Sequence, residues 1–185
     1  MPYIENIRDQ ATELNKQIDC IIEYSGMLAT SVKFSWFNLR EVIEFYIKIN
    51  QFTAIAKGVK LEHVAYSGPD VIYSNETAIR LILKNLLGNA LKFTHAGSVK
   101  VSVTDNAIEI ADTGIGIPAD KHALIFERFE RGERSDQSQY EGSGLGLSIV
   151  RDAAERIGAS VSVESELGKG SIFKVTFGGV KNDGE

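Results

Sequence analysis

The N-terminal segment has a regular pattern of apolar residues. Between residues 3 and 29, apolar positions recur in alternating steps of three and four, with polar residues between them. This heptad pattern predicts one long helix with a narrow apolar seam. Such a helix gains little stability alone, so we expect it to pack on a second chain, which the regularity favours, or on its own domain. The seam comprises Ile4, Ile7, Ala11, Leu14, Ile18, Ile21, Ser25 and Leu28.

The rest of the chain alternates predicted helices and strands. A short strand over 33–37 leads to Asn38, which forms a capping box with Glu41 and opens a helix that ends before Gly58. Hydrophobic periodicity and turn residues predict the other elements. We expect strands over 59–65, 71–73, 98–103, 107–111, 160–164 and 171–177, and helices over 76–94, 119–126 and 145–157.

The helix after Asn38 has a broad apolar face, which we expect to be buried. Its members are Val42, Ile43, Phe45, Tyr46, Ile49 and Phe52. Together with the order of the elements, this face predicts an α/β two-layer sandwich. Helices would cover one face of a mixed, mostly antiparallel sheet, and the long N-terminal helix would be attached to it.

The helix that begins after Asn75 carries polar residues that a purely structural helix does not need. Asn85 and Asn89 lie four residues apart on one stripe, and Lys92 follows on the next turn. Asparagine is a mediocre helix former and is costly to bury without partners. An amide oxygen can bind Mg²⁺ and an ammonium can meet a phosphate, so this edge predicts a site for a polar ligand. A solvated helix face is the alternative reading.

Three glycine clusters lie at the ends of predicted elements: Gly114-Ile-Gly116, Gly142-Ser-Gly-Leu-Gly146 and Gly168-Lys-Gly170. Glycine allows the main chain to approach a ligand closely. The second cluster also opens a helix, where free amides attract phosphate. The third cluster alone would indicate a hairpin turn. None of them has the Walker or Rossmann spacing, and the motifs of serine, threonine and tyrosine kinases are missing.

Composition narrows the class of protein. The chain is 43% hydrophobic and 24% charged with a net charge of −5, as in an ordinary soluble domain and unlike most nucleic-acid binders. Cys20 is the only cysteine, which excludes an internal disulfide and suits a reducing compartment. His63, His95 and His122 lack metal-ligand spacing, so zinc is not expected. No apolar run approaches the ~20 residues of a membrane span.

Five short motifs together have a specific resemblance. They occur in the order and spacing of the N, G1, F, G2 and G3 boxes, and residues 37–177 therefore resemble the catalytic ATP-binding domain of bacterial sensor histidine kinases. These kinases belong to the superfamily of gyrase, Hsp90, histidine kinases and MutL, which has the Bergerat ATP-binding fold. The motifs are Asn85-x-x-x-Asn89, Asp112-x-Gly114-x-Gly116, Phe126-Glu-Arg-Phe129, Gly142-x-Gly144-Leu-Gly146-Leu and Gly168-x-Gly170.

The resemblance also implies a division into domains. Residues 1–30 are similar to the second helix of the kinase dimerisation domain, without the helix that carries the acceptor. Residues 31–38 would be a linker, residues 39–180 the catalytic ATP-binding domain, and residues 181–185 a disordered tail.

Roles for individual residues follow from the matching positions. Asn89 would bind the Mg²⁺ that bridges the ATP phosphates, Asn85 would line the phosphate site, and Lys92 would contact phosphate. Asp112 would accept a hydrogen bond from the adenine amino group, although an Asp before glycine can also simply cap a turn. The other implied nucleotide contacts are Phe93, Gly114, Gly116, Ile117, Phe126, Phe129, Gly142, Ser143, Gly144, Leu145, Gly146, Leu147 and Ser171.

Residues 130–143 match the ATP lid of the family, anchored by Phe126 and Phe129. Arg131 lies where a lid arginine contacts phosphate, but a charge-rich loop can equally be solvated. The resemblance therefore implies that Asn85, Lys92 and Arg131 carry the catalytic work.

The reaction class depends on Asn85. Superfamily members that hydrolyse ATP generally carry glutamate there, whereas asparagine is no general base at pH 7. Phosphoryl transfer to an outside nucleophile is therefore favoured over water attack. In histidine kinases this nucleophile is a histidine followed by an acidic residue, and none of the three histidines has that setting. We expect a truncated or naturally split kinase that does not phosphorylate itself.

The implied cofactors are ATP and Mg²⁺. The implied partners are a second copy bound through the N-terminal helix, an acceptor-histidine domain and a response regulator receiver domain. We expect a cytoplasmic location, no nucleic acid and no membrane segment in this chain. Two alternatives are a hydrolysing ATPase of the same superfamily and a degenerate module that only dimerises or regulates.

Overall fold

A computed structural model describes most of the catalytic region and part of the N-terminal segment. The described N-terminal positions are all helical, and none of the helices in the described part is long and apolar enough to cross a bilayer. Predictions for the remaining positions, including 129–143 and 179–185, lie outside the described residues. The described residues are 7–8, 11, 14–15, 18, 21–22, 24–26, 33–128 and 144–178.

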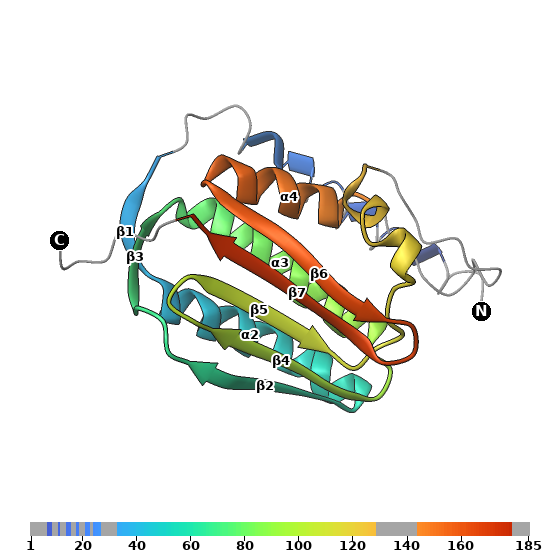
Figure 1. Cartoon of the computed structure of the whole chain (residues 1–185). Coiled ribbons are helices and arrows are strands. Elements are labelled where there is room, and N and C mark those ends of the chain that lie inside the picture. Colours follow the sequence, from blue (N-terminus) through green and yellow to red (C-terminus); the bar gives the residue numbers. More distant parts are fainter. Residues whose placement is uncertain are drawn as a thin grey trace.

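The main sheet has five strands in the order β2-β4-β5-β7-β6 (Figure 1). The edge strand β2 (Val59–Tyr66) pairs in parallel with β4 (Gly97–Val103). The next strands, β5 (Ala107–Asp112), β7 (Gly170–Phe177) and β6 (Ala159–Glu166), all pair antiparallel. The sheet is therefore mixed and mostly antiparallel, as predicted.

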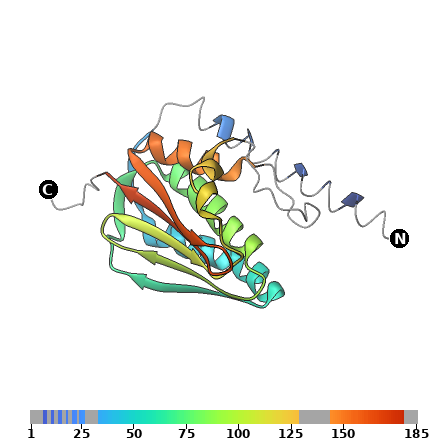
Figure 2. The same cartoon turned by 45° about the vertical axis from the view of Figure 1, so that its right-hand side comes forward.

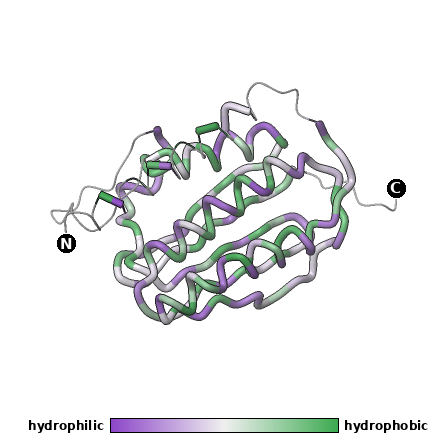
Figure 3. Tube along the Cα trace, turned by 180° about the vertical axis from the view of Figure 1, so that it is seen from behind, coloured by the Kyte–Doolittle hydropathy of each residue, from purple (hydrophilic) through white to green (hydrophobic). Residues whose placement is uncertain are grey.

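Three helices cover one face of this sheet and leave the other face open (Figures 1 and 2). They are α2 (Leu39–Lys57), α3 (Glu76–Phe93) and α4 (Gly146–Arg156). The arrangement confirms the predicted α/β two-layer sandwich. Viewed from the helix side, apolar and polar residues alternate along the helices, as expected when one face of each meets the sheet (Figure 3).

The core lies between the two layers. Inward-facing strand residues, one in every two, meet the apolar stripes of the helices. α3 runs through the middle of the helix layer and contributes the largest share of buried side chains. The largest fully buried side chains include Leu39, Ile43, Ile72, Ile79, Ile82, Leu83, Leu86, Leu87, Ile108, Ile110, Val99 and Val101.

Local sequence signals place the helix ends. The Asn38 side chain accepts a hydrogen bond from the Glu41 amide at 3.0 Å, and the two side chains also bond to each other at 3.0 Å. Asn75 caps α3 in the same way, accepting from the amide of Ala78 at 2.8 Å. Gly58 ends α2 at φ +67°, a conformation that glycine adopts without strain. All three caps confirm the sequence analysis.

Two short strands form a separate sheet. β1 (Ser35–Asn38) pairs antiparallel with β3 (Val71–Ser74) beside the end of the main sheet (Figure 1). The sequence predicted both strands but not their pairing with each other, which brings residues almost forty positions apart into register.

The prediction of a broad buried face on α2 is wrong in part. Phe45, Ile49 and Phe52 are 49%, 51% and 86% exposed. α2 lies at the end of the helix layer, and among the described elements it packs mainly on β2, β3 and α3, so one stripe of α2 makes these contacts. That stripe contains Leu39, Val42, Ile43, Tyr46 and Ala54.

The single short helix predicted over 119–126 is also wrong. The segment forms two separate 3₁₀ turns, Ala119–Lys121 and Leu124–Phe126. Eight residues rarely sustain an α-helix without strong packing, and neither turn has a side-chain cap. The second turn nevertheless buries Phe126, whose ring meets Phe173 edge-on at 6.4 Å.

Candidate nucleotide site

The polar edge of α3 meets the start of α4. The side-chain nitrogen Nδ2 of Asn85 donates to the Leu81 carbonyl at 2.8 Å, one turn back on α3. A Cβ atom added at Gly146 would lie 3.0 Å from Asn85 Oδ1 and 3.8 Å from Asn89 Nδ2. The structure therefore brings the two asparagines and the helix-opening glycine together, from segments some sixty residues apart.

The start of α4 places the first main-chain amides of a helix at this point. Leu145 at the N-cap makes no capping hydrogen bond with its side chain, and its carbonyl accepts from Ser148 Oγ at 2.8 Å. Gly144 adopts φ +69°, which turns the chain into the helix. The first amides of a helix, together with its dipole, attract anions, so this end suits a phosphate group.

Lys92 and Phe93 lie at the other end of the polar edge. The Lys92 ammonium is 5.3 Å from the centre of the Phe93 ring. Lys57, which the sequence analysis did not single out, donates to the carbonyls of Leu91 at 2.5 Å and Lys92 at 3.1 Å. Its charge satisfies the C-terminal end of α3, so Lys57 supports the segment that carries Lys92.

Asp112 ends β5 with its carboxylate beside two main-chain donors. Oδ1 accepts from the Gly114 amide at 2.8 Å, and the Ser171 amide is a second donor. Burial raises the pKa of the Asp112 carboxyl above its usual value, although these two donors oppose the change. A carboxylate held in this way can still accept a hydrogen bond from a ligand.

Ser171 belongs to a small polar cluster next to Asp112. Its hydroxyl is 2.9 Å from that of Ser165, which donates to the Gly170 carbonyl at 2.8 Å and accepts from the Ile117 amide at 2.8 Å. Sequence reasoning missed Ser165. Its only signal was a small polar residue at an inward-facing strand position.

The first and third glycine clusters pack against each other. A Cβ atom at Gly114 would overlap the Phe93 carbonyl, and one at Gly116, which has φ +68°, would overlap the Glu166 carbonyl. The Gly168 amide donates to the Ile115 carbonyl at 2.7 Å. These glycines are therefore needed for contacts within the chain, in addition to any approach by a ligand.

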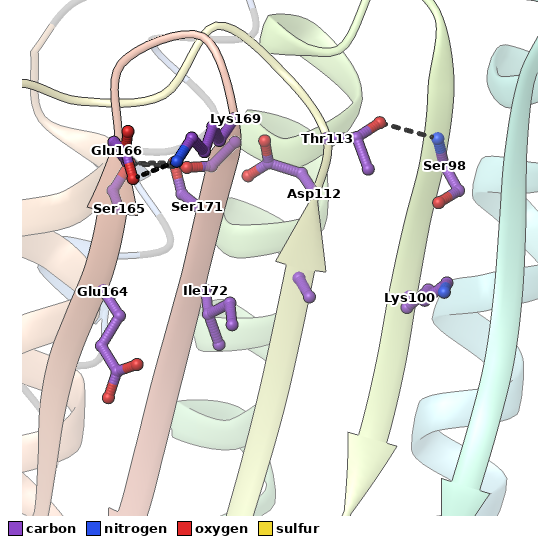
Figure 4. Close-up of a pocket in the computed structure, with 12 residues that line it drawn as sticks. Ser98, Lys100, Asp112, Thr113, Glu164, Ser165, Glu166, Lys169, Ser171 and Ile172 are labelled. Carbon is purple, nitrogen blue, oxygen red and sulfur yellow. Dashed lines mark hydrogen bonds and ion pairs between the residues drawn. The ribbon is translucent and has the colours of Figure 1, made fainter.

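An open hollow of about 510 Å³ borders the same strand ends (Figure 4). It includes Asp112, Ser165 and Ser171, and extends along the open face of the sheet past Lys100 and Ile172. The Lys169–Glu166 ion pair, at 2.8 Å, lies at its upper edge.

The remaining predicted contacts divide into two groups. Ile117, Leu145 and Leu147 are partly buried and pack against the core. The predictions for Phe129, Arg131, Gly142 and Ser143 concern residues outside the described part of the chain.

Comparison with known proteins identifies the family. Residues 74–179 match the family described as histidine kinase-, DNA gyrase B- and HSP90-like ATPases. The sensory/regulatory protein RpfC of Xanthomonas campestris is 32% identical over 185 residues, covering 92% of this chain and 25% of that protein. The sensor histidine kinase AruS of Pseudomonas aeruginosa is 37% identical over 149 residues, covering 74% of this chain and 15% of that protein.

Among solved structures, full-length ShkA in complex with AMPPNP matches with a TM-score of 0.75 and 28% identity. The match covers 94% of this chain and 37% of ShkA. The chain belongs to the family of histidine kinase-, DNA gyrase B- and HSP90-like ATPases, and its catalytic domain is of the sensor histidine kinase type. It spans only about a quarter of the length of RpfC.

Proposed function

We propose that this domain binds Mg·ATP and transfers the γ-phosphoryl group to a histidine outside these 185 residues. The observation that carries the proposal is the approach of Asn85 and Asn89 to Gly146 at the start of α4. The Asn85 side-chain oxygen, the Asn89 amide group and the first main-chain amides of α4 converge there, which suits a metal-bound polyphosphate.

The residues present fit a magnesium ion. Mg²⁺ prefers oxygen ligands and keeps several waters, so a protein site supplies only one or two groups. The side-chain nitrogen of Asn85 donates to the Leu81 carbonyl and its oxygen faces Gly146, and Asn89 lies one turn further along the same stripe. Asn89 would hold the ion. When bound, the ion neutralises charge on the phosphates.

The other end of the site would recognise the base. Asp112 would accept a hydrogen bond from the adenine amino group, and the two main-chain donors orient its carboxylate for this. Lys92 and the first amides of α4 would contact the phosphates. Phe129, Arg131, Gly142 and Ser143 would complete the nucleotide site, with Arg131 on a phosphate.

Asn85 supports transfer in preference to hydrolysis. Its amide is not a base, and the side-chain atoms nearest to a Cβ placed at Gly146 belong to Asn85 and Asn89, which are both neutral amides. Water near the phosphates would therefore lack a partner to take its proton. The acceptor would instead be an imidazole, which is nucleophilic without prior deprotonation when neutral.

The proposed partners follow from the exposed N-terminal seam and from the relatives. Ile7, Leu14 and Ile18 are 67%, 57% and 44% exposed, and pairing with a second copy would cover them. The similarity to a sensory/regulatory protein and to a hybrid signal transduction histidine kinase supports a receiver domain as the final phosphoryl acceptor.

A phosphotransfer assay tests the proposal. The chain is mixed with [γ-³²P]ATP, Mg²⁺ and a separately purified helical hairpin carrying the acceptor histidine of a related kinase. Wild type should label the hairpin, and Asn89→Ala should abolish labelling. Asn50→Ala is the matched control, because Asn50 lies on α2 and its side chain donates to the Tyr46 carbonyl within the same helix.

The outcomes separate the alternatives. Steady phosphate release by the chain alone, lost in Asn89→Ala, would identify a hydrolysing ATPase instead. Absence of both labelling and nucleotide binding would leave a module that only dimerises or regulates, and the proposal would be wrong.

A further inference from the structure

Two consecutive residues after Phe126 are ion-paired with two consecutive residues of α4. Glu127 Oε1 lies 2.7 Å from Arg151 Nη1, and Arg128 Nη2 lies 3.0 Å from Asp152 Oδ2. The two pairs have opposite polarity, so each residue of one segment has its complement on the other. They attach the outer side of α4 to the segment that follows the second 3₁₀ turn.

Tyr24 of the N-terminal helix joins this network. Its hydroxyl donates to Asp152 Oδ2 and accepts from Arg128 Nη2 at 2.8 Å. The Arg128 guanidinium is also 5.8 Å from the centre of the Tyr24 ring. The side chain of Asp152 is only 20% exposed, and its Oδ2 accepts hydrogen bonds from both of these donors.

The network acts on the helix that forms the phosphate end of the site. Asp152 lies six residues after Gly146, about 9 Å along the axis of α4. The opposite side of α4 packs on the core through Ile149, Val150 and two alanines. Because a close-packed interior transmits small displacements, contacts on the outer side of α4 bear on the position of the whole helix.

We propose that Tyr24, Arg128 and Asp152 are positioning residues that hold α4 so that its first amides face Asn85 and Asn89. The N-terminal helix thereby controls the affinity for the phosphate part of the nucleotide. This inference rests on the proposed function, because it concerns the same nucleotide site. It adds a dependence on a residue outside the segment 74–179 that matches the family.

We expect loss of this network to weaken ATP binding several-fold. Exposed ion pairs contribute little, and Arg128 and Glu127 are 56% and 58% exposed. A hydrogen bond to a charged, mostly buried carboxylate contributes more, so Tyr24 and Asp152 should dominate. α4 would shift without unfolding.

Isothermal titration with ATP and with adenosine tests the proposal. Adenosine lacks phosphates, so the ratio of the two affinities isolates the phosphate end. Tyr24→Phe should weaken ATP binding about three- to tenfold and leave adenosine binding within about twofold. Asp152→Asn should do the same, and the double variant should lose less than the sum of the two single losses, because the two changes share the Tyr24–Asp152 hydrogen bond.

Tyr66→Phe is the matched control. The Tyr66 hydroxyl also makes one hydrogen bond, to the Pro69 carbonyl at 2.8 Å, but it lies on β2, away from α4. Arg128→Gln is a second test. Arg128 is exposed, so this substitution should not affect folding, and it should also lower the ratio of ATP affinity to adenosine affinity.

One result would contradict the positioning role alone, and a different result would contradict the proposed function. In the first, wild type binds both ligands, but the ratio of ATP affinity to adenosine affinity is the same in the Tyr66→Phe control as in Tyr24→Phe, Asp152→Asn and Arg128→Gln. The positioning role would then be wrong. If wild type binds neither ligand, the proposed function itself is wrong.

Discussion

Substitution of Asp112 by asparagine tests the base-binding end of the site. The Asp112 carboxylate has two oxygens, and the Gly114 and Ser171 amides both donate to it. Asparagine keeps one oxygen, which can still accept from Gly114 at a distance near the present 2.8 Å. Its NH₂ group takes the place of the second oxygen and would face only other donors, including the adenine amino group.

The expected loss of ATP affinity follows from replacing a carboxylate oxygen by an NH₂ group. A hydrogen bond to a charged group contributes about 1.5–3 kcal/mol, so its loss should weaken ATP binding about 10- to 100-fold. The fold should survive the substitution. Burying the charged carboxylate costs free energy that the neutral amide avoids, and the amide has nearly the same shape. The free energy of unfolding at pH 7 should therefore change by less than about 1 kcal/mol, or rise.

Isothermal titration of ATP measures the affinity, and urea unfolding followed by circular dichroism measures the stability. Asp120→Asn is the control, since Asp120 is exposed on the first 3₁₀ turn. ATP binding by Asp112→Asn within twofold of wild type would refute the assigned role. Loss of binding together with loss of the folded state would show that Asp112 is structural.

Two further predictions concern pH and the core. Burial raises the pKa of Asp112, and ATP requires the ionised carboxylate, so the affinity should fall as pH is lowered through the raised pKa and Asp112→Asn should show a flatter profile. Because the folded-state pKa exceeds the unfolded one, Asp112 stabilises the fold at low pH and loses this contribution as pH rises through the raised pKa. Without ATP, wild type should therefore lose stability relative to Asp112→Asn as pH rises above about 4 in urea titrations, and the opposite trend would contradict the burial argument. On α2, Ile43→Ala should lower the free energy of unfolding by about 2–5 kcal/mol, whereas Phe52→Ala should change it by less than about 0.5 kcal/mol, because Ile43 is fully buried and Phe52 is 86% exposed. Equal losses in urea unfolding would mean that the Phe52 stripe is covered in solution.

The sequence by itself determined the elements and their ends. Asn38, Asn75 and Gly58 act within a few residues, through side-chain caps and a positive φ that only the local chain decides. Strand alternation and helical periodicity likewise depend on near neighbours, and they were sufficient for the two-layer class. The order of the five motifs identified the kinase type before any contact was known.

Only the tertiary structure decided which distant residues meet. Asn85 and Gly146 come together because α3 and α4 lie side by side on one face of the sheet, and the Tyr24–Asp152 contact joins residues 128 positions apart. The exposed stripe of α2 has the same cause: an apolar periodicity shows that a helix has an apolar face, but the position of the helix at the end of its layer decides how much of that face is covered. Caps and periodicity are set by neighbours along the chain, whereas burial and the assembly of a site are set by the order of the strands and the packing of the layers.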